Sequence, residues 1–324
     1  MITNNFAKHC IDNGGILIPL NIDSSLMTGT SFLNPSVFID DSGKILINIR
    51  HTDYTVFHSI TGKYRLYGKG LRYDYAQDVN RTITTNYICE LNNQYNISAA
   101  YKINTSSLDK DPQYAYVGLE DARLVNWNNT FYLSGTRRDT TSHGEVRIEL
   151  SEIQFNENQV VEINRVRMPA PGENNSYCEK NWMPILDRPF HFVKWTNPTE
   201  VVRFDIDTQI TTTVQLNDYN WAVNLSNLKG GSHLVPWNGY YVAVVHESYY
   251  DEAESTQYLH RFAIWDQNLN LKMVSDTFIF MDGSIEFCCG MAYHNHNFFL
   301  SFGFQDNISF LLKFPESIIY QIFS

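Results

Sequence analysis

The stretch VGLEDARL places two carboxylates and a guanidinium, those of Glu120, Asp121 and Arg123, within four consecutive residues. Charged residues make up 18% of the chain, so such a cluster directly before an apolar run is unusual here. A carboxylic acid in a cleft can donate a proton to a leaving group. The alternative is an ion-paired corner between strands, where Arg123 only neutralises a buried carboxylate. We predict that this cluster supplies the acid of an active site, with Glu120 and Arg123 among the side chains that bind substrate.

The elements that must position this cluster form a repeated pattern. Five segments each have a polar or small head, a short apolar strand, a turn, and a second strand rich in aromatic and aliphatic residues. Their turns are rich in Asn, Asp and Gly, which tolerate tight-turn dihedrals. The segments are NPSVFIDDSGKILINIR (34–50), EDARLVNWNNTFYLSGTR (120–137), EKNWMPILDRPFHFVKW (179–195), GGSHLVPWNGYYVAVVH (230–246) and EFCCGMAYHNHNFFLSFG (286–303).

Short alternating apolar segments with little helical periodicity are typical of an all-β protein. The repeated segments start roughly 50 to 85 residues apart, which leaves room for a four-stranded blade. We therefore predict an all-β fold, a five-bladed β-propeller whose active site lies at the central funnel. The propeller is expected to be a single domain over residues 1–324, with blade cores at about 30–315. A β-sandwich is the alternative. It would not need the same polar residues five times at the start of a hairpin, its head, and at the end of the second strand, its tail.

Hairpin geometry predicts where the polar residues gather. In an antiparallel hairpin, the start of the first strand lies beside the end of the second. Asn34 and Arg50 are sixteen residues apart, and so are Asp121 and Arg137. Heads and tails should therefore converge on one face, around the funnel. The polar residues expected there are Asn34, Arg50, Glu120, Asp121, Arg123, Arg137, Lys180, Asn181, Ser232, His233, His246, Glu286 and Asp306.

These segments resemble a known family. GLEDAR is similar to the GxEDPR motif of glycoside hydrolase family 130, the β-mannoside phosphorylases and related hydrolases. The heads NPS, EKNWMP, GGSHLVPWNGYYVAVVHE and IEFCCGMA…LSFGFQD resemble blade-start motifs of that family, in the same order, over roughly residues 30–315. One departure is Ala122, where the family has Pro, because a proline would restrict the preceding Asp to an extended conformation.

The resemblance implies a five-bladed propeller and an inverting mechanism with one catalytic Asp, which corresponds to Asp121. In the family this acid is thought to act through a sugar hydroxyl that relays the proton to the glycosidic oxygen. The resemblance also implies that phosphate is held by Arg50, by Arg137 or Arg138, and by Lys180 and His246. Strand alternation lets only one of the two adjacent arginines face the funnel, and we predict Arg137.

Chemistry supports the same division of roles. Inverting hydrolysis needs one carboxyl group as acid and another as base, whereas phosphate is already a nucleophile and needs no base. One prominent Glu-Asp pair among several cations therefore favours a phosphate or sugar-phosphate site over plain hydrolysis. Together with the resemblance, this predicts phosphorolysis of β-mannosides or similar glycosides. Inorganic phosphate or a sugar phosphate would be the co-substrate, with no further cofactor. The alternatives are a mannosyltransferase-like glycosyltransferase that uses a sugar phosphate or nucleotide sugar, and a non-catalytic glycan-binding propeller.

The remaining candidates would bind the sugar. Trp182 could stack on a sugar ring, although aromatic residues more often pack between blades. An HxH spacing at the predicted turn 295–297 has no third ligand, so no metal site is expected. The other residues expected to bind sugar hydroxyls are Asn34, Asn181, His233, Glu286 and Asp306.

Composition limits the partners. The formal net charge of −11 argues against nucleic acid and against anionic membranes. Five cysteines without a pairing pattern indicate free thiols in a reducing compartment. The N-terminus carries no signal-peptide pattern, so we expect a cytoplasmic protein. The expected partner is an oligosaccharide or other glycoside, and a homo-oligomer is possible.

Overall fold

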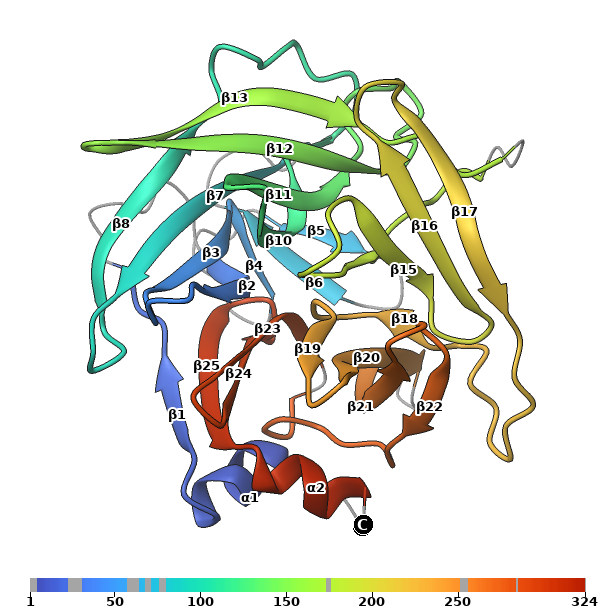
Figure 1. The fold of residues 1–324 in the computed structure, drawn as a ribbon. Coiled ribbons are helices and arrows are strands. Elements are labelled where there is room, and N and C mark those ends of the chain that lie inside the picture. The colour runs from blue at the N-terminus through green and yellow to red at the C-terminus, as the bar shows by residue number, and fades with distance from the viewer. Residues whose placement is uncertain are drawn as a thin grey trace.

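The computed structural model describes residues 5–22, 31–56, 64–67, 71–75, 80–172, 176–250, 256–283 and 285–323. These residues form 25 strands and only two short helices, arranged as sheets around a centre (Figure 1). An all-β architecture is therefore confirmed. No helix in these ranges is long and apolar enough to cross a membrane.

The largest sheet contains two four-stranded halves. The first half runs in the order β8, β7, β3, β2, and the second in the order β10, β11, β12, β13. A short parallel contact between β13 and β8 joins the halves, and β9 pairs with β7. The bounds are β2 Ser31–Ile39, β3 Ile45–Thr52, β7 Thr82–Leu91, β8 Ile97–Asn104, β9 Tyr116–Val117, β10 Glu120–Trp127, β11 Thr130–Arg137, β12 Arg147–Asn156 and β13 Gln159–Arg167.

Four further sheets complete the structure. One is β14 Met183–Pro184, β15 His191–Trp195, β16 Thr199–Asp205 and β17 Ile210–Asn217. The next is β18 Lys229–Gly230, β19 Val235–Trp237, β20 Tyr240–Tyr250, β21 Thr256–Asp266 and β22 Leu271–Val274. The last large sheet is β23 Glu286–His294, β24 Asn297–Phe304, β25 Ile308–Pro315 and β1 Ile16–Pro19. A small sheet is β4 Tyr54–Val56, β5 Tyr64–Tyr67 and β6 Leu71–Tyr75.

All five predicted segments form antiparallel hairpins: β2–β3, β10–β11, β14–β15, β18 and β19 with β20, and β23–β24. Two of the turns show why. Asn128 and Asn129 have φ of 53° and 62°, and Asn238 and Gly239 have φ of 47° and 79°. Two consecutive left-handed residues make the tight turn that matches the twist of a hairpin. The propeller-like arrangement is confirmed, and the count of five blades stays a prediction.

Bulges shift the predicted head-to-tail register. The pairing slips between Leu33 and Ser36 in β2 and between Glu120 and Arg123 in β10. A bulge inserts an extra residue and turns its side chain in a new direction. Thus Leu33, rather than Asn34, lies opposite Arg50.

The two ends of the described chain meet in one sheet. β1 pairs with β25, with Ile16 opposite Lys313, so this sheet includes residues that precede residue 30. Helices α1 (Phe6–Asp12) and α2 (Ser317–Phe323) contribute buried side chains to the same apolar cluster, which includes Phe6 and Ile319. Other apolar clusters lie between neighbouring sheets, and they fix the distances between the strand heads.

Candidate active site

A cavity of about 140 Å³ lies where strand heads and tails from different sheets converge. We call it the funnel pocket. Eight of the thirteen polar residues expected at the funnel line it, so the predicted convergence is largely present, while their roles stay predictions. The other five are Arg123, Arg137, Ser232, His233 and Glu286, and Ser232 is fully buried with its hydroxyl donating to the carbonyl of His233. The lining residues are Asn34, Arg50, Glu120, Asp121, Thr136, Arg138, Lys180, Asn181, Lys229, His246, Ser248, Tyr258, Ile285, Phe287 and Asp306.

Asp121 is held by residues of the first hairpin. Asn34 Nδ2 donates to Asp121 Oδ1 at 2.8 Å, and Arg50 Nη1 lies 2.7 Å from the same oxygen. The backbone carbonyl of Asp121 accepts from Cys289 Sγ at 3.3 Å and from Arg123 Nη1 at 3.1 Å. Burial alone would raise the pKa of Asp121, but Arg50 and Asn34 outweigh burial and lower it. The free protein therefore holds Asp121 as a carboxylate.

Four residues of the funnel pocket share an uncommon backbone conformation. Asn34, Asp121, Asn181 and Asp306 have φ of 47°, 50°, 59° and 47°. Asn and Asp are the side chains that tolerate this left-handed region best. Strained backbone of this kind persists where the surrounding structure imposes it, and it often marks functional sites. The sequence gives one hint of this backbone conformation, because each of the four positions is an Asn or Asp at a head or just beyond a tail.

Cationic and imidazole groups also line the funnel pocket. Lys229 lies opposite His246 in the sheet, and its Nζ is 3.2 Å from Ser248 Oγ. Burial and then nearby Lys180 lower the pKa of Lys229. Burial and then His260 lower the pKa of His246 well below its usual value, so the imidazole is neutral at pH 7. A neutral ring donates one hydrogen bond and accepts another.

The prediction for Arg137 is wrong. Its Nε lies 2.5 Å from Glu149 Oε1 and its Nη1 lies 3.5 Å from Asp139 Oδ2, away from the funnel pocket. Arg138 lines the pocket instead, with its guanidinium 5.2 Å from the ring centre of Tyr116. Successive side chains of a strand point to opposite faces, so one residue decides the outcome.

Arg123 and His233 are also placed away from the funnel pocket. Both are fully buried. Arg123 Nε donates to the carbonyl of Gly231 at 2.7 Å and so joins two sheets. His233 Nδ1 accepts from the backbone N–H of Met291 at 3.4 Å, and burial followed by Arg123 lowers its pKa to about 3. Neither side chain lines the funnel pocket, and the contacts that the structure shows for both are with the protein interior.

Glu286 and Trp182 are corrected in the same way. Glu286 is fully buried and its carboxylate accepts hydrogen bonds from the backbone N–H groups of Phe280, Met281 and Gly283. Burial raises its pKa. Trp182 is 1% exposed, and its Nε1 donates to Glu179 at 3.1 Å. Neither side chain lines the funnel pocket.

Trp182→Ala is therefore expected to act on stability. Removing a buried tryptophan should lower the free energy of unfolding by about 3–5 kcal/mol, through lost apolar burial and the cavity left behind. Trp182→Phe should cost less, since the ring contact with Phe192 can persist. Urea unfolding of both variants measures this. A stable Trp182→Ala variant with impaired sugar binding would restore the stacking role.

Asp306 titrates unusually. Burial raises its pKa to about 6, although Arg50 opposes the shift. Because the folded protein holds this proton more tightly than the unfolded chain does, Asp306 contributes a loss of stability as pH rises from about 4 to about 6. Asp306→Asn should remove that loss and raise stability at pH 7 by up to ~3 kcal/mol. Urea unfolding between pH 4 and pH 7 tests this; equal pH slopes for variant and wild type would contradict it.

Several lining residues escaped the sequence prediction. Lys229 directly precedes the fourth head, and Ser248 lies two residues beyond His246 on the same face of β20. Tyr258 lies opposite Ser248 on β21. The two-residue period could have found Ser248, but nothing in the sequence marks Tyr258. Among the described residues no group of three or more His, Cys, Asp or Glu side chains is placed to hold a metal ion.

No protein-family model matches this chain, and no curated protein matches its sequence. Three similar solved structures are a β-1,2-mannobiose phosphorylase from Listeria innocua in complex with β-1,2-mannobiose, the mannose phosphorylase MPT-4 from Leishmania mexicana in complex with phosphate ion, and a structure from work on GH130 glycoside hydrolases that target β-1,2 mannosidic linkages in Candida mannan.

The similarity spans most of each chain. The Listeria enzyme is 13% identical with a TM-score of 0.58, covering 94% of this chain and 96% of its own. The Leishmania enzyme is 12% identical with a TM-score of 0.51, covering 97% and 92%. The GH130 structure is 11% identical with a TM-score of 0.55, covering 89% and 85%. At these identities the likeness is one of fold, and this chain has the all-β, propeller-like fold of GH130 mannoside phosphorylases and glycoside hydrolases.

Proposed function

We propose that this protein is a carbohydrate-active enzyme that breaks or forms a β-mannosidic or similar glycosidic bond, with inversion and with phosphate as co-substrate. The observation that supports it most is the funnel pocket, which the strained Asp121 lines together with a group of cationic and imidazole side chains. Structural neighbours in complex with β-1,2-mannobiose and with phosphate add support for the ligand classes. The group comprises Arg50, Arg138, Lys180, Lys229 and His246.

In this proposal Asp121 is the acid that delivers a proton to the glycosidic oxygen through a sugar hydroxyl. An acid must be protonated when it acts, whereas Arg50 keeps Asp121 ionised in the free protein. Phosphate that binds to Arg50 adds negative charge beside Asp121. It also competes with Asp121 for the positive charge of Arg50. Both effects raise the pKa of Asp121, so phosphate binding prepares the acid.

The cations would hold the phosphate in two ways. Arg138 offers a planar pair of N–H donors that matches two phosphate oxygens, and Lys180 and Lys229 offer compact positive charges. Neutral His246 donates a single hydrogen bond. Phosphate then attacks the sugar without help from a base.

Hydrolysis is the second candidate, and Asp306 favours it. A hydrolase needs a second carboxyl group to activate water, and Asp306 lines the same pocket as Asp121. With a pKa of about 6, Asp306 is mostly ionised at pH 7 and can accept a proton from water. A glycosyltransferase would use the same cations to hold a sugar phosphate or nucleotide sugar.

One experiment separates these functions. The protein is incubated with β-1,2-mannobiose with and without phosphate, and in reverse with a panel of sugar 1-phosphates and acceptors while released phosphate is measured. Phosphorolysis predicts cleavage that requires phosphate and release of phosphate in reverse. Cleavage that is indifferent to phosphate would establish hydrolysis instead. Binding without any product would leave a glycan-binding propeller.

Arg138→Met is expected to raise the KM for phosphate by roughly 10- to 100-fold, because a charge-assisted hydrogen-bonding group is lost. Arg137→Met is the matched control, since the neighbouring arginine faces Glu149. The control should unfold at lower urea concentration but keep the KM for phosphate. Initial rates over a phosphate series measure both, and a larger KM effect from Arg137→Met would contradict the placement of the two arginines.

A further inference from the structure

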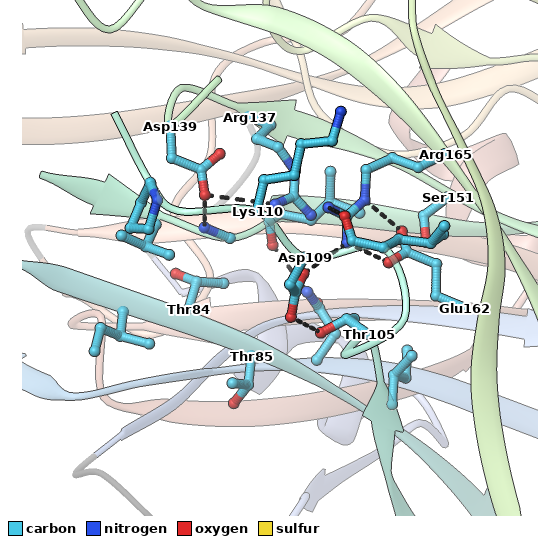
Figure 2. A pocket seen from close by; sticks show the side chains of 18 of the residues that line it. Thr84, Thr85, Thr105, Asp109, Lys110, Arg137, Asp139, Ser151, Glu162 and Arg165 are labelled. Carbon is cyan, nitrogen blue, oxygen red and sulfur yellow. Dashed lines mark hydrogen bonds and ion pairs between the residues drawn. The ribbon is translucent and has the colours of Figure 1, made fainter. Parts of the chain in front are cut away.

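A second cavity, of about 690 Å³, lies between β7 and β8 on one side and β11, β12 and β13 on the other. We call it the side cavity. Figure 2 shows Arg137, Asp139, Arg165 and Glu162 along one side of it and Thr84 and Thr85 on the opposite side. Residues 105 and 108–113 form a further part of its lining. Nothing in the proposed chemistry of the funnel pocket uses this space.

The side cavity and the funnel pocket share a thin wall. Thr136 lines the funnel pocket and the next residue, Arg137, lines the side cavity. Across the wall, Arg50 of the funnel pocket donates from Nε to Oγ1 of Thr84 in the side cavity at 3.3 Å. Gly118 completes the wall, because a Cβ there would overlap the carbonyl oxygen of Thr84. The two spaces are therefore neighbours at the same ends of the strands.

The charges that line the side cavity balance. Three of them are buried, namely Arg137, Asp139 and Glu162. Glu162 is 1% exposed and pairs with two nitrogens of Arg165. Arg165 also contacts Asp109 at 3.0 Å, so much of the charge is already neutralised. The acidic groups are Asp109, Asp111, Asp139 and Glu162, and the basic groups are Lys102, Lys110, Arg137 and Arg165.

Balanced charge selects neither an anion nor a cation. The same lining offers hydroxyl, amide and carboxylate acceptors beside guanidinium and ammonium donors, with Thr85, Asn86 and Ser151 among the neutral ones. Asp139 is 7% exposed, and its Oδ1 is a buried acceptor without a hydrogen-bond partner. A neutral ligand rich in hydroxyl groups can use donors and acceptors of this mixture together. Sugar units have that chemistry.

Size points the same way. Pockets that enclose a small ligand usually measure about 300–1,000 Å³. The funnel pocket, at about 140 Å³, is too small for an oligosaccharide together with phosphate, whereas the side cavity, at about 690 Å³, lies within that range.

From these observations we infer that the side cavity binds the non-reacting units of an oligosaccharide whose reacting bond lies beside Asp121. This inference rests on the proposed function, and it names the substrate class as a chain of sugars instead of a simple glycoside. In this inference the reacting end of the sugar chain lies at the head of β10, and the rest of the chain passes over the rim of the wall into the space between β8 and β13.

The test fills the side cavity and varies substrate length. Thr140 is an exposed residue of the lining, and Thr140→Trp places a large ring in the cavity. For β-1,2-mannobiose and its three- and four-unit homologues, kcat/KM of the wild type should rise about tenfold or more with length. In Thr140→Trp that rise should be lost. Thr212→Trp, at an exposed threonine of β17, is the matched control and should keep the rise.

Two results would overturn the inference: no gain with length in the wild type, or a gain that persists in a folded Thr140→Trp variant. A wild type that turns over no glycoside, with or without phosphate, would contradict the proposed function instead. The side cavity is then tested by calorimetric binding of the four-unit chain to the wild type and to Thr140→Trp. Binding that only Thr140→Trp loses would support the inference, and absence of binding to the wild type would contradict it.

Discussion

Asp121→Asn is expected to lower kcat for glycoside cleavage by about 10²- to 10⁴-fold, the range that a positioned general acid contributes. Asparagine has nearly the same shape, and its side-chain oxygen can still accept the hydrogen bond from Asn34. It has no acidic proton to deliver. Steady-state rates on β-1,2-mannobiose with saturating phosphate measure the effect, and urea unfolding verifies that the variant is folded.

Glu120→Gln is the matched control for this substitution. Glu120 is the adjacent carboxylate, and its Oε2 lies 3.8 Å from Arg50 Nη2, so the control also removes one negative charge from the funnel pocket. It should lower kcat much less than Asp121→Asn. If Asp121→Asn keeps the wild-type rate, Asp121 is not the acid, and Asp306 becomes the next carboxyl group to substitute.

The second large effect is expected at Arg50. This arginine is buried, and Arg50→Met leaves Asp121 and Glu120 without their main counter-charge. The free energy of unfolding at pH 7 should fall by about 3 kcal/mol, the lower end of the range for a broken buried pair. We expect the lower end because the Asp121 side chain is 23% exposed and water can partly solvate it.

The pH dependence identifies the cause. The pKa of Asp121 is lowered in the folded protein, so its stabilising effect is present above the unfolded pKa and is lost as pH falls. The deficit of Arg50→Met should therefore be large at pH 7 and shrink below about pH 4. Arg203→Met, which breaks a pair with both partners at least 40% exposed, should change stability by less than about 1 kcal/mol. An Arg50→Met deficit that is equal at both pH values would point to lost packing.

The five hairpins could be predicted because they are local. A hairpin needs two apolar strands and a turn that tolerates left-handed residues, and the sequence displays both within some seventeen residues. The convergence of the strand heads followed from antiparallel pairing alone. β1 could not be predicted in this way, because its partner β25 lies at the opposite end of the described chain.

The errors at the site have two physical causes. Bulges near Asn34 and Asp121 add a residue that the sequence pattern does not reveal, and they shift the predicted head-to-tail pairs. Arg137 and Arg138 are adjacent, and the alternation of side chains at the end of β11 turns only one of them toward the funnel pocket. The second cause is burial between sheets. Trp182 and Glu286 stand at strand heads, yet their side chains turn into the packed interior, a choice made by tertiary contacts. The side cavity could not be predicted either, because it lies between the two halves of the largest sheet and depends on how these halves are placed.

The pairing of β1 with β25 also bears on how the molecule assembles. Each hairpin joins residues close in the chain, so it can form early and by itself, whereas β1 must wait until β25 has been synthesised. Closing so long a loop carries a large entropic cost, which grows with the logarithm of loop length. High contact order of this kind slows folding. The contact between β1 and β25 joins only four residue pairs, from Ile16–Lys313 to Pro19–Phe310. We expect this short contact to form late in folding and to be stabilised afterwards by the apolar packing of α1 and α2.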